Sequence, residues 1–430
     1  SVTDQSSTTA NITAKSLTVS GITASDKIYD GSTSATLTGS AVYSGLVSGD
    51  TFTGSYTGVF ANANVGTGKT VTITSSYSGA DINNYSVTDQ SSTTADISAK
   101  ALTATASASN KTYDGGTTAS TTLTFTGLVG SETLGQTVGS TFDNKNVGSN
   151  KTVTVNSITL ANGSNGGLAA NYSISTGQTT TANITAKALT VSGITASNKT
   201  YDGSTNVTLT GTAVYSGLVN GDTFDGTYTG VFSDKNAGVG KTVTITSSYS
   251  GADVSNYSVT DQSSTTANIT AKALTVSGIT ASDKTYDGST SATLDPSLVV
   301  YSGLVPGDTF NGSYTGAFSN ANVGTGKTVN ITSSYSGADV NNYSVTDQSS
   351  TTADISAKVL TATASASNKT YDGGTTASTT LTFTGLVGSE TLGQTVGSTF
   401  DNKNVGSNKT VTVNSITLGN GSNGGLAANY

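Results

Sequence analysis

Carboxylates and lysines recur side by side in this chain, and their spacing decides what chemistry they could do. Asp30 lies between Tyr29 and Gly31, with Lys27 just before them. One carboxylate is too little for calcium, which takes about six to eight oxygen ligands, and no Asp-x-Asp-x-Asp spacing occurs. Paired carboxylates for glycoside hydrolysis are not apparent either. We therefore expect Asp30 to shape a turn beside the tyrosine ring.

The residue types that are missing limit the chemistry further. The chain has no Cys, His, Met or Trp, all 18 basic residues are Lys, and the only glutamates are Glu132 and Glu390. Without His or Cys there is no ordinary proton shuttle near neutral pH, no thiolate nucleophile and no common zinc site. We expect no enzyme activity, no cofactor and no metal site.

Two other chemistries find only partial support. Residues 66–70 read Gly-Thr-Gly-Lys-Thr, like part of a phosphate-binding loop, but Ala63 stands where that pattern needs glycine and a strand follows instead of a helix. A β-turn is the better interpretation. Lys27 and its equivalents lie near Asn and Asp, which leaves open a Lys–Asn isopeptide cross-link, although that chemistry needs a buried acid as catalyst.

Charge and hydropathy exclude two classes of partner. The net charge of −8 is spread thinly, and no lysine run with interleaved aromatics offers a nucleic-acid surface. No apolar stretch approaches the roughly 18 residues that cross a bilayer, so we expect no membrane insertion in this segment. The chain starts at Ser1 without a charged, apolar leader, which suggests a processed or excised piece. The lack of cysteine is compatible with export.

Two markers recur together along the chain. Ala-Lys before an apolar strand returns at a period of about 86 residues, and Tyr-Asp-Gly keeps the same period. Five units follow. The Tyr-Asp-Gly motifs, predicted to be structural, are Tyr29, Asp30 and Gly31; Tyr113, Asp114 and Gly115; Tyr201, Asp202 and Gly203; Tyr286, Asp287 and Gly288; and Tyr371, Asp372 and Gly373.

Period-two alternation of apolar residues predicts an all-β fold. In the first unit it shows in Leu17 and Val19, and again in Val71 and Ile73, with Thr or Ser between them. About seven short strands, separated by Gly, Asn and Asp turns, indicate an immunoglobulin-like β-sandwich in each repeat. The predicted boundaries are 1–13 for the last strands of a preceding repeat, then 14–98, 99–185, 186–270, 271–356, and 357–430, which lacks its last strands.

A tyrosine late in each repeat has the spacing of a tyrosine corner. Asp81 precedes Tyr85 by four residues and Val87 follows it by two. The alternative is that Tyr85 is only a core aromatic. The candidates are Tyr85, Tyr172, Tyr257, Tyr343 and Tyr430.

The splice between repeats is short. Only residues 98–101 separate Ile97, the last inward residue of one repeat, from Leu102, the first of the next. This is too short for a flexible linker, so neighbouring sandwiches should abut in a stiff rod, each about 35–40 Å long. The predicted junction lysines are Lys100, Lys187, Lys272 and Lys358.

The two ends of the chain complement each other. Tyr430 is the late tyrosine of the fifth repeat, and Ser1 resumes with the residues that normally follow that tyrosine. The sequence is either a window on a continuous array, or residues 1–13 of one copy complete residues 357–430 of the next by strand donation.

The motif set resembles a known family. Lys-x-Tyr-Asp-Gly, Gly-Asp-x-Phe at residues 49–52, Asn-Val-Gly-x-x-Lys-Thr-Val at residues 146–153, Asn-Tyr-Ser and Ala-x-Ile-x-Ala-Lys are similar to the YDG-type repeat domains of large bacterial surface adhesins and filamentous haemagglutinin-like proteins. The third unit departs from the middle motif, with Asn236-Ala-Gly-Val-Gly-Lys. The resemblance implies export and a place in a long surface or matrix protein, and it supplies no catalytic residues.

Two functions therefore stand as hypotheses. The first is the structural stalk or filament body of a secreted adhesin or matrix fibre, a repetitive spacer in cell attachment or biofilm whose partners are neighbouring repeats or copies of itself. The second is a multivalent module that binds host or matrix glycans through exposed Tyr and Asn side chains. Both place the chain at the bacterial cell surface or in the extracellular matrix.

Overall fold

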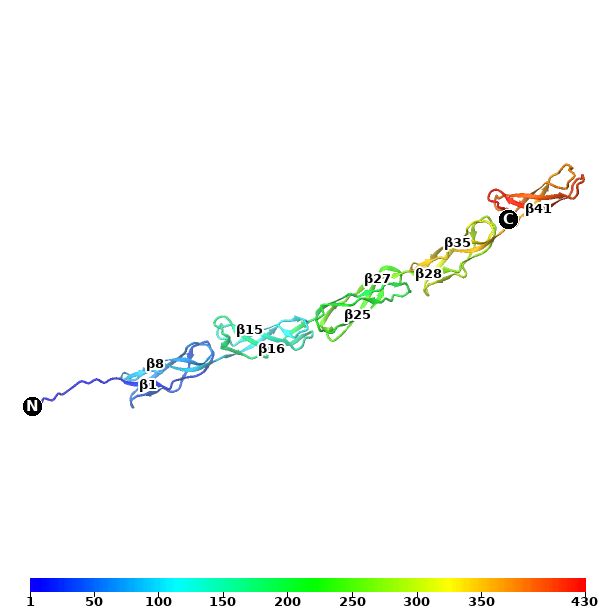
Figure 1. Ribbon diagram of the computed structural model, residues 1–430. Coiled ribbons are helices and arrows are strands. Elements are labelled where there is room, and N and C mark those ends of the chain that lie inside the picture. Colours follow the sequence, from blue (N-terminus) through cyan, green and yellow to red (C-terminus); the bar gives the residue numbers. More distant parts are fainter. The chain divides into compact units, whose positions relative to one another are not determined.

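The computed structural model describes residues 1–430, and Figure 1 shows the course of the chain. It divides into two compact units, each described here by itself: residues 1–191, 215–226 and 249–260 in the first, and residues 192–214, 227–248 and 261–430 in the second. The division falls inside the third repeat. All four junctions between consecutive repeats therefore lie within one unit or the other.

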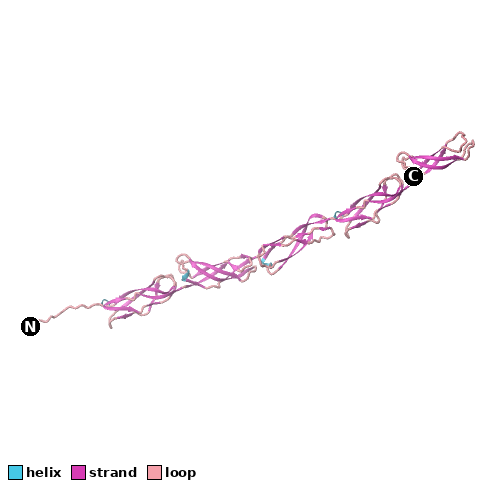
Figure 2. Cartoon of the chain, viewed as in Figure 1, coloured by secondary structure: helices cyan, strands magenta, loops and turns pink.

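Strands and loops make up almost the whole chain (Figure 2), as expected from the abundance of Thr, Val and Gly. The only helical segments are five short 3₁₀ turns, each directly before a late tyrosine. They are η1 (Ile82–Asn84), η2 (Ala169–Asn171), η3 (Val254–Asn256), η4 (Val340–Asn342) and η5 (Ala427–Asn429). No helix is long and apolar enough to span a membrane.

The first repeat shows the plan. One sheet has the order β6-β1-β9 and the other β3-β10-β8-β7-β4, with the small pair β2-β5 beside them. The strands are β1 (Lys15–Ser20), β2 (Thr23–Ala24), β3 (Lys27–Ile28), β4 (Ser34–Ala35), β5 (Leu37–Thr38), β6 (Val42–Ser44), β7 (Thr53–Phe60), β8 (Gly66–Ser78), β9 (Tyr85–Thr88) and β10 (Ser92–Ser98).

The two sheets face each other across a buried layer. Alternate residues of β1 point inward, and Val19 shares a cluster with Ile22 and with Ile73 of β8 in the opposite sheet. β1 pairs in parallel with β9 and antiparallel with β6, so it occupies the centre of its sheet. This arrangement confirms the predicted β-sandwich.

The second repeat keeps the plan with longer strands. They are β11 (Lys100–Ala108), β12 (Lys111–Thr112), β13 (Thr118–Ala119), β14 (Thr121–Thr126), β15 (Leu134–Phe142), β16 (Gly148–Asn162), β17 (Tyr172–Ile174) and β18 (Thr179–Thr185). β15 lies beside residues 153–162 of β16 (Figure 1), and the two form an antiparallel hairpin with one bulge at Gly139.

The third and fourth repeats follow the first. Their strands are β19 (Lys187–Ser192), β20 (Thr195–Ala196), β21 (Lys199–Thr200), β22 (Leu209–Thr210), β23 (Val214–Ser216), β24 (Asp225–Phe232), β25 (Gly238–Ser250), β26 (Tyr257–Thr260) and β27 (Ser264–Thr270), then β28 (Lys272–Ser277), β29 (Thr280–Ala281), β30 (Lys284–Thr285), β31 (Ser291–Ala292), β32 (Leu294–Asp295), β33 (Val300–Ser302), β34 (Asn311–Phe318), β35 (Gly324–Ser336), β36 (Tyr343–Thr346) and β37 (Ser350–Ser356).

The fifth repeat has only two hairpins, from β38 (Thr361–Ala366) and β39 (Thr379–Thr384), and from β40 (Leu392–Phe400) and β41 (Val411–Asn420). It has no counterpart of β18, because the sequence ends at Tyr430. Lys369–Thr370 is consequently not a strand, since its equivalent β12 pairs with β18. Residues 1–14 form no strand and are exposed.

The expected strand number was too low. The first repeat has ten strands in place of about seven, because short bridged segments such as β2–β5 flank its turns. The expectation of short strands fails for β8 and β16, which span 13 and 15 residues.

Replacing Leu17 by alanine should destabilise the first repeat. Leu17 is fully buried against Phe52 and Tyr85, so a cavity there costs about 2–5 kcal/mol. Native-state hydrogen exchange should show that loss of protection in repeat 1 and little change in repeat 4. Val42→Ala, at a side chain that is 55% exposed, is the control. Equal effects of the two changes would contradict the assigned core.

Candidate functional site at the repeat junctions

A half-buried carboxylate joins the first repeat to the second. The Tyr29 hydroxyl donates to Glu132 Oε1 at 2.6 Å, and the Tyr172 hydroxyl donates to Glu132 Oε2 at 2.6 Å. The two rings meet edge to face, with centroids 5.4 Å apart. Tyr29 belongs to repeat 1, whereas Glu132 and Tyr172 belong to repeat 2. We call this trio the tyrosine–carboxylate bridge.

The same bridge stands at every junction, with aspartate in place of glutamate at two of them. Each carboxylate accepts one bond from the Tyr-Asp-Gly tyrosine of the preceding repeat and one from the late tyrosine of its own repeat. The remaining bridges are Tyr113–Asp222–Tyr257 (2.8 and 2.6 Å), Tyr201–Asp308–Tyr343 (2.8 and 2.5 Å) and Tyr286–Glu390–Tyr430 (2.6 and 2.6 Å).

The late tyrosines differ from the predicted tyrosine corner. The Tyr85 hydroxyl accepts a bond from the Val47 N–H at 3.0 Å, far upstream in the chain, and donates to Asp50. A corner would return to backbone a few residues away. Asp81, whose spacing suggested the corner, instead accepts the Thr51 N–H at 2.9 Å. The tyrosines thus hold the carboxylate that faces the neighbouring repeat.

A buried asparagine adds a second link, which the sequence analysis missed. Asn171 is 1% exposed; its Oδ1 accepts the Val65 N–H at 2.9 Å, and its Nδ2 donates to Asn64 Oδ1 at 3.1 Å. The sequence contained a signal for this link, because an Asn-Tyr pair occurs late in every repeat. Asn256, Asn342 and Asn429 make the equivalent bonds to Val147, Ala237 and Val323.

Glycine is needed in the Tyr-Asp-Gly motif for two reasons. Gly31 has φ +76°, in the left-handed region that glycine favours, and a Cβ there would come within 2.8 Å of Val129 in the next repeat. Gly115, Gly203 and Gly288 meet Val219, Val305 and Val387 in the same way, while Gly373 has nothing within 4 Å.

The aspartate of the motif works locally. Asp30 accepts the Ser32 N–H at 2.8 Å and pairs with Lys27 Nζ at 2.8 Å, so it closes the turn that presents Tyr29. Burial alone would raise the pKa of Asp202, the equivalent residue in the third repeat, but Lys199 and the bonds from Ser204 outweigh it and lower the pKa to about 2. Lys27 is held by a carboxylate and carbonyls.

Two junctions carry an additional lysine. Lys145 Nζ lies 3.0 Å from Asp222 Oδ1 and 2.8 Å from Asp253 Oδ1, and Lys235 is placed likewise near Asp308 (3.3 Å) and Asp339 (3.1 Å). Burial would raise the pKa of Asp222, but bonds from Tyr257, Tyr113 and Lys145 lower it overall. Asp253 and Asp222 in turn raise the pKa of Lys145.

The predicted junction lysines contribute main chain. Lys100 begins β11, with only Ala99 between it and the end of β10, and it aligns with Tyr172 in the parallel pair β11–β17. Lys187 and Lys272 align with Tyr257 and Tyr343 in the same way. Lys358 is not in a strand, but its N–H donates to the Asn429 carbonyl at 3.0 Å.

The apolar core continues through each junction. Tyr29, Phe60 and Ile97 of repeat 1 pack in one cluster with Leu102 and Tyr172 of repeat 2. The other junctions have comparable clusters, in which Tyr113 packs with Tyr257, Tyr201 with Tyr343, and Tyr286 with the partly buried Tyr430. Neighbouring repeats therefore share buried residues as well as hydrogen bonds.

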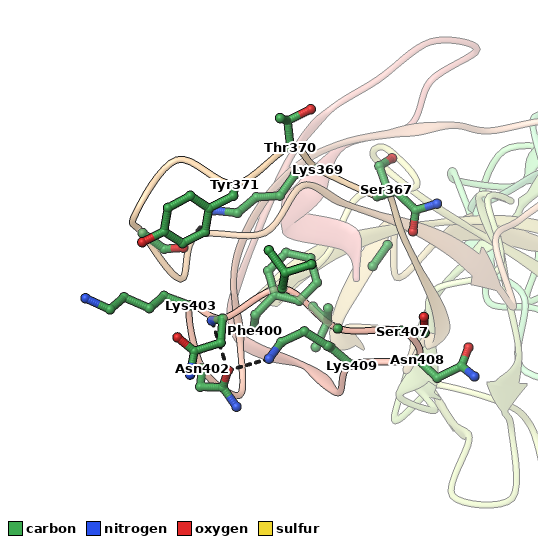
Figure 3. Close-up of a pocket in the computed structure, with 17 residues that line it drawn as sticks. Ser367, Lys369, Thr370, Tyr371, Phe400, Asn402, Lys403, Ser407, Asn408 and Lys409 are labelled. Atoms are coloured by element: carbon green, nitrogen blue, oxygen red, sulfur yellow. Dashed lines mark hydrogen bonds between the residues drawn. The ribbon is translucent and has the colours of Figure 1, made fainter.

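A hollow lies where the fifth repeat lacks these partners. It has a volume of about 720 Å³ and is lined by Tyr371, Phe400 and Lys409 among others (Figure 3). Tyr371 is 58% exposed, whereas the equivalent Tyr29 is 4% exposed. The hollow is thus an uncovered end of a sandwich and not a formed ligand pocket.

No group of three or more Asp or Glu side chains could hold a metal ion. Gly66 to Thr70, the segment like a phosphate-binding loop, forms the start of strand β8 and precedes no helix. The chemistry that the junctions do support is recognition of one repeat by the next.

Removing one hydroxyl of the bridge should loosen the first junction. Tyr29→Phe leaves Glu132 with one donor fewer in a half-buried site, which costs about 1–3 kcal/mol. Hydrogen exchange should show faster opening of the backbone around Tyr29 and Val65. Tyr371→Phe is the matched control, because that ring is exposed and forms no tyrosine–carboxylate bridge in the structure. Unchanged exchange in Tyr29→Phe would show that the bridge adds no stability.

Alkaline pH should break the bridges. Burial, and then the hydrogen bond to Glu132, raise the pKa of Tyr29 to about 12 from 10.0, and Tyr257, Tyr286 and Tyr343 also reach about 12. The folded chain holds these hydroxyl protons more tightly than the unfolded chain does. The contribution of the bridges to the free energy of unfolding is therefore complete below pH 10 and is lost as pH rises toward 12. Tyrosinate absorbance should show a distinct high-pH step that Tyr29→Phe reduces. A single step near pH 10 with the strands intact would contradict this.

The comparisons agree with the repeat structure. A family model for the YDG domain matches residues 13–95, 98–182, 185–267, 270–353 and 356–430. No curated protein sequence matches the chain. The five matched segments contain the five Tyr-Asp-Gly motifs and the late tyrosines that build the bridges. The chain therefore belongs to the YDG domain family, as five tandem copies of that domain.

Proposed function

We propose that the chain is part of the stalk or filament body of a secreted bacterial adhesin or extracellular matrix fibre. In this role it is a stiff repetitive spacer in cell attachment or biofilm, at the cell surface or in the matrix, without enzyme activity. The observation that carries the proposal is the shared core and tyrosine–carboxylate bridge at each of the four junctions. A spacer must transmit position and force, and a splice with buried contacts resists bending.

Junctions of this kind suit a stiff spacer better than the small contacts between independent modules would. Inter-domain contacts that are small and polar allow relative motion, whereas contacts continuous with the core oppose it. Here the next repeat begins one residue after β10 ends, and Tyr29 and Tyr172 meet in a single cluster. Length then depends on the number of repeats.

Glycan or matrix binding is the competing function. A glycan-binding surface would need exposed aromatic rings, and Tyr371 is the only exposed tyrosine of the 19 in the chain. The hydroxyls of Tyr43 and Tyr56 bond to each other at 3.0 Å. These observations favour the spacer.

Strand donation remains the alternative assembly. Residues 1–14 are exposed and unpaired, and the apolar side chains of Val359, Leu360 and Phe383 line a second hollow on the fifth repeat. Residues 1–13 repeat the sequence of residues 258–270, most of which pairs within the structure as β26 and β27. The same segment of another copy could therefore fill the missing strands.

Solution scattering tests the spacer function. A stiff chain of five repeats, each about 35–40 Å long, should scatter as one rod whose length falls by about one repeat when repeat 4 is removed. Binding of the intact chain to a glycan array is measured in parallel. A scattering profile of freely jointed beads, or specific glycan binding that survives while stiffness is lost, would contradict the spacer.

A further inference from the structure

The junctions fall into two chemical kinds. Where the first repeat of a pair has alanine, at Ala63 or Ala321, the second has one glutamate and a leucine, as in Glu132 and Leu168. Where the first has lysine, at Lys145 or Lys235, the second has two aspartates, as in Asp222 and Asp253. All four junctions obey this rule, although the fourth lies in the near-copy of the first.

Charge and reach explain the two combinations. A lysine with two aspartates carries the same net charge as a single glutamate, so both kinds of junction have a net charge of −1. Glutamate is one methylene longer and bridges both tyrosines with separate oxygens. Asp222 uses Oδ2 for both tyrosines and leaves Oδ1 for Lys145. Its carboxylate is 3% exposed, so an unmatched second acid would be costly there.

The fifth repeat presents one half of such a junction. It has lysine at this position, Lys403, beside the exposed Tyr371 and next to Asn404. In Figure 3 the Lys403 side chain extends away from Phe400 and Lys409, and no ion pair joins it to a carboxylate. Val405, equivalent to the half-buried Val147, is 88% exposed.

The first repeat presents the other half, already assembled. Its acids are Asp50 and Asp81, the two-aspartate set. Tyr85 donates to Asp50 and accepts the Val47 N–H, as the late tyrosines do at the occupied junctions. Asp81 is held by the Thr51 N–H. The end is therefore preorganised to receive a lysine.

We propose that these positions form a pairing code between repeats, in which a lysine end takes a two-aspartate end and an alanine end takes a glutamate end. By this code the uncovered end of repeat 5 docks the Asp50–Asp81 end of repeat 1 in a second copy of this chain. The proposal names the partner of the end-to-end assembly given above and rests on it. The pairing of Lys403 with two aspartates is separable from the strand that residues 1–13 would donate.

A two-by-two exchange in the intact chain tests the code. One partner carries Lys403 or Lys403→Ala; the other carries Asp50 and Asp81, or the pair Asp50→Glu and Asp81→Leu, which copies the natural end of repeat 2. Association is followed by sedimentation. Lys403 with two aspartates, and alanine with glutamate, should bind about tenfold more tightly than the two mismatched pairs.

Zero-length carbodiimide cross-linking between isotope-labelled and unlabelled copies gives a second reading. Lys403 should join Asp50 or Asp81 of the other copy, with the internal Lys145–Asp253 link as a positive control. Protein concentration is raised until unselective cross-links between surface groups appear. Equal affinity in all four pairs, or cross-links from Lys403 to scattered acids while the control forms, would overturn the code. Loss of binding only when residues 1–13 are deleted would assign assembly to the strand instead.

Discussion

The structure depends on one interaction, a carboxylate that is withdrawn from water and held by two tyrosine hydroxyls from different repeats. A buried charge is costly unless it is fully hydrogen-bonded, so the acid specifies where both rings must lie. At the first junction those rings belong to Tyr29 and Tyr172. The Tyr-Asp-Gly turn, the Gly–Val contact and the Asn-Tyr pair all serve to place these two rings.

This requirement explains the residue types of the Tyr-Asp-Gly motif in this chain. Tyr29 supplies the hydroxyl, Asp30 closes the turn with Lys27, and Gly31 makes room for Val129. Each of these residues therefore has a partner at or beside the junction. In this chain the Tyr-Asp-Gly motif is part of the contact surface between consecutive repeats.

The sequence was sufficient to predict the sandwich fold of each repeat and the number of repeats. Alternation in Leu17 and Val19, and the period of the Tyr-Asp-Gly motif, depend on local geometry that a single repeat contains. It was not sufficient for the junction, because Glu132 meets Tyr29 across 103 residues and nothing in the spacing of either predicts that contact. The late tyrosine was found but interpreted as a local corner, since its hydrogen-bond partners lie in a distant loop of its own repeat. At the first junction its ring also packs against Tyr29 of the preceding repeat.

Distance measurement across one junction tests the central claim most directly, namely that neighbouring repeats are held in a single relative orientation. The chain has no cysteine, so two introduced cysteines at exposed sites, one in repeat 1 and one in repeat 2, carry the only spin labels. Pulsed electron resonance should give one narrow distance distribution that broadens in Tyr29→Phe. A broad distribution in the unmodified junction would contradict the account.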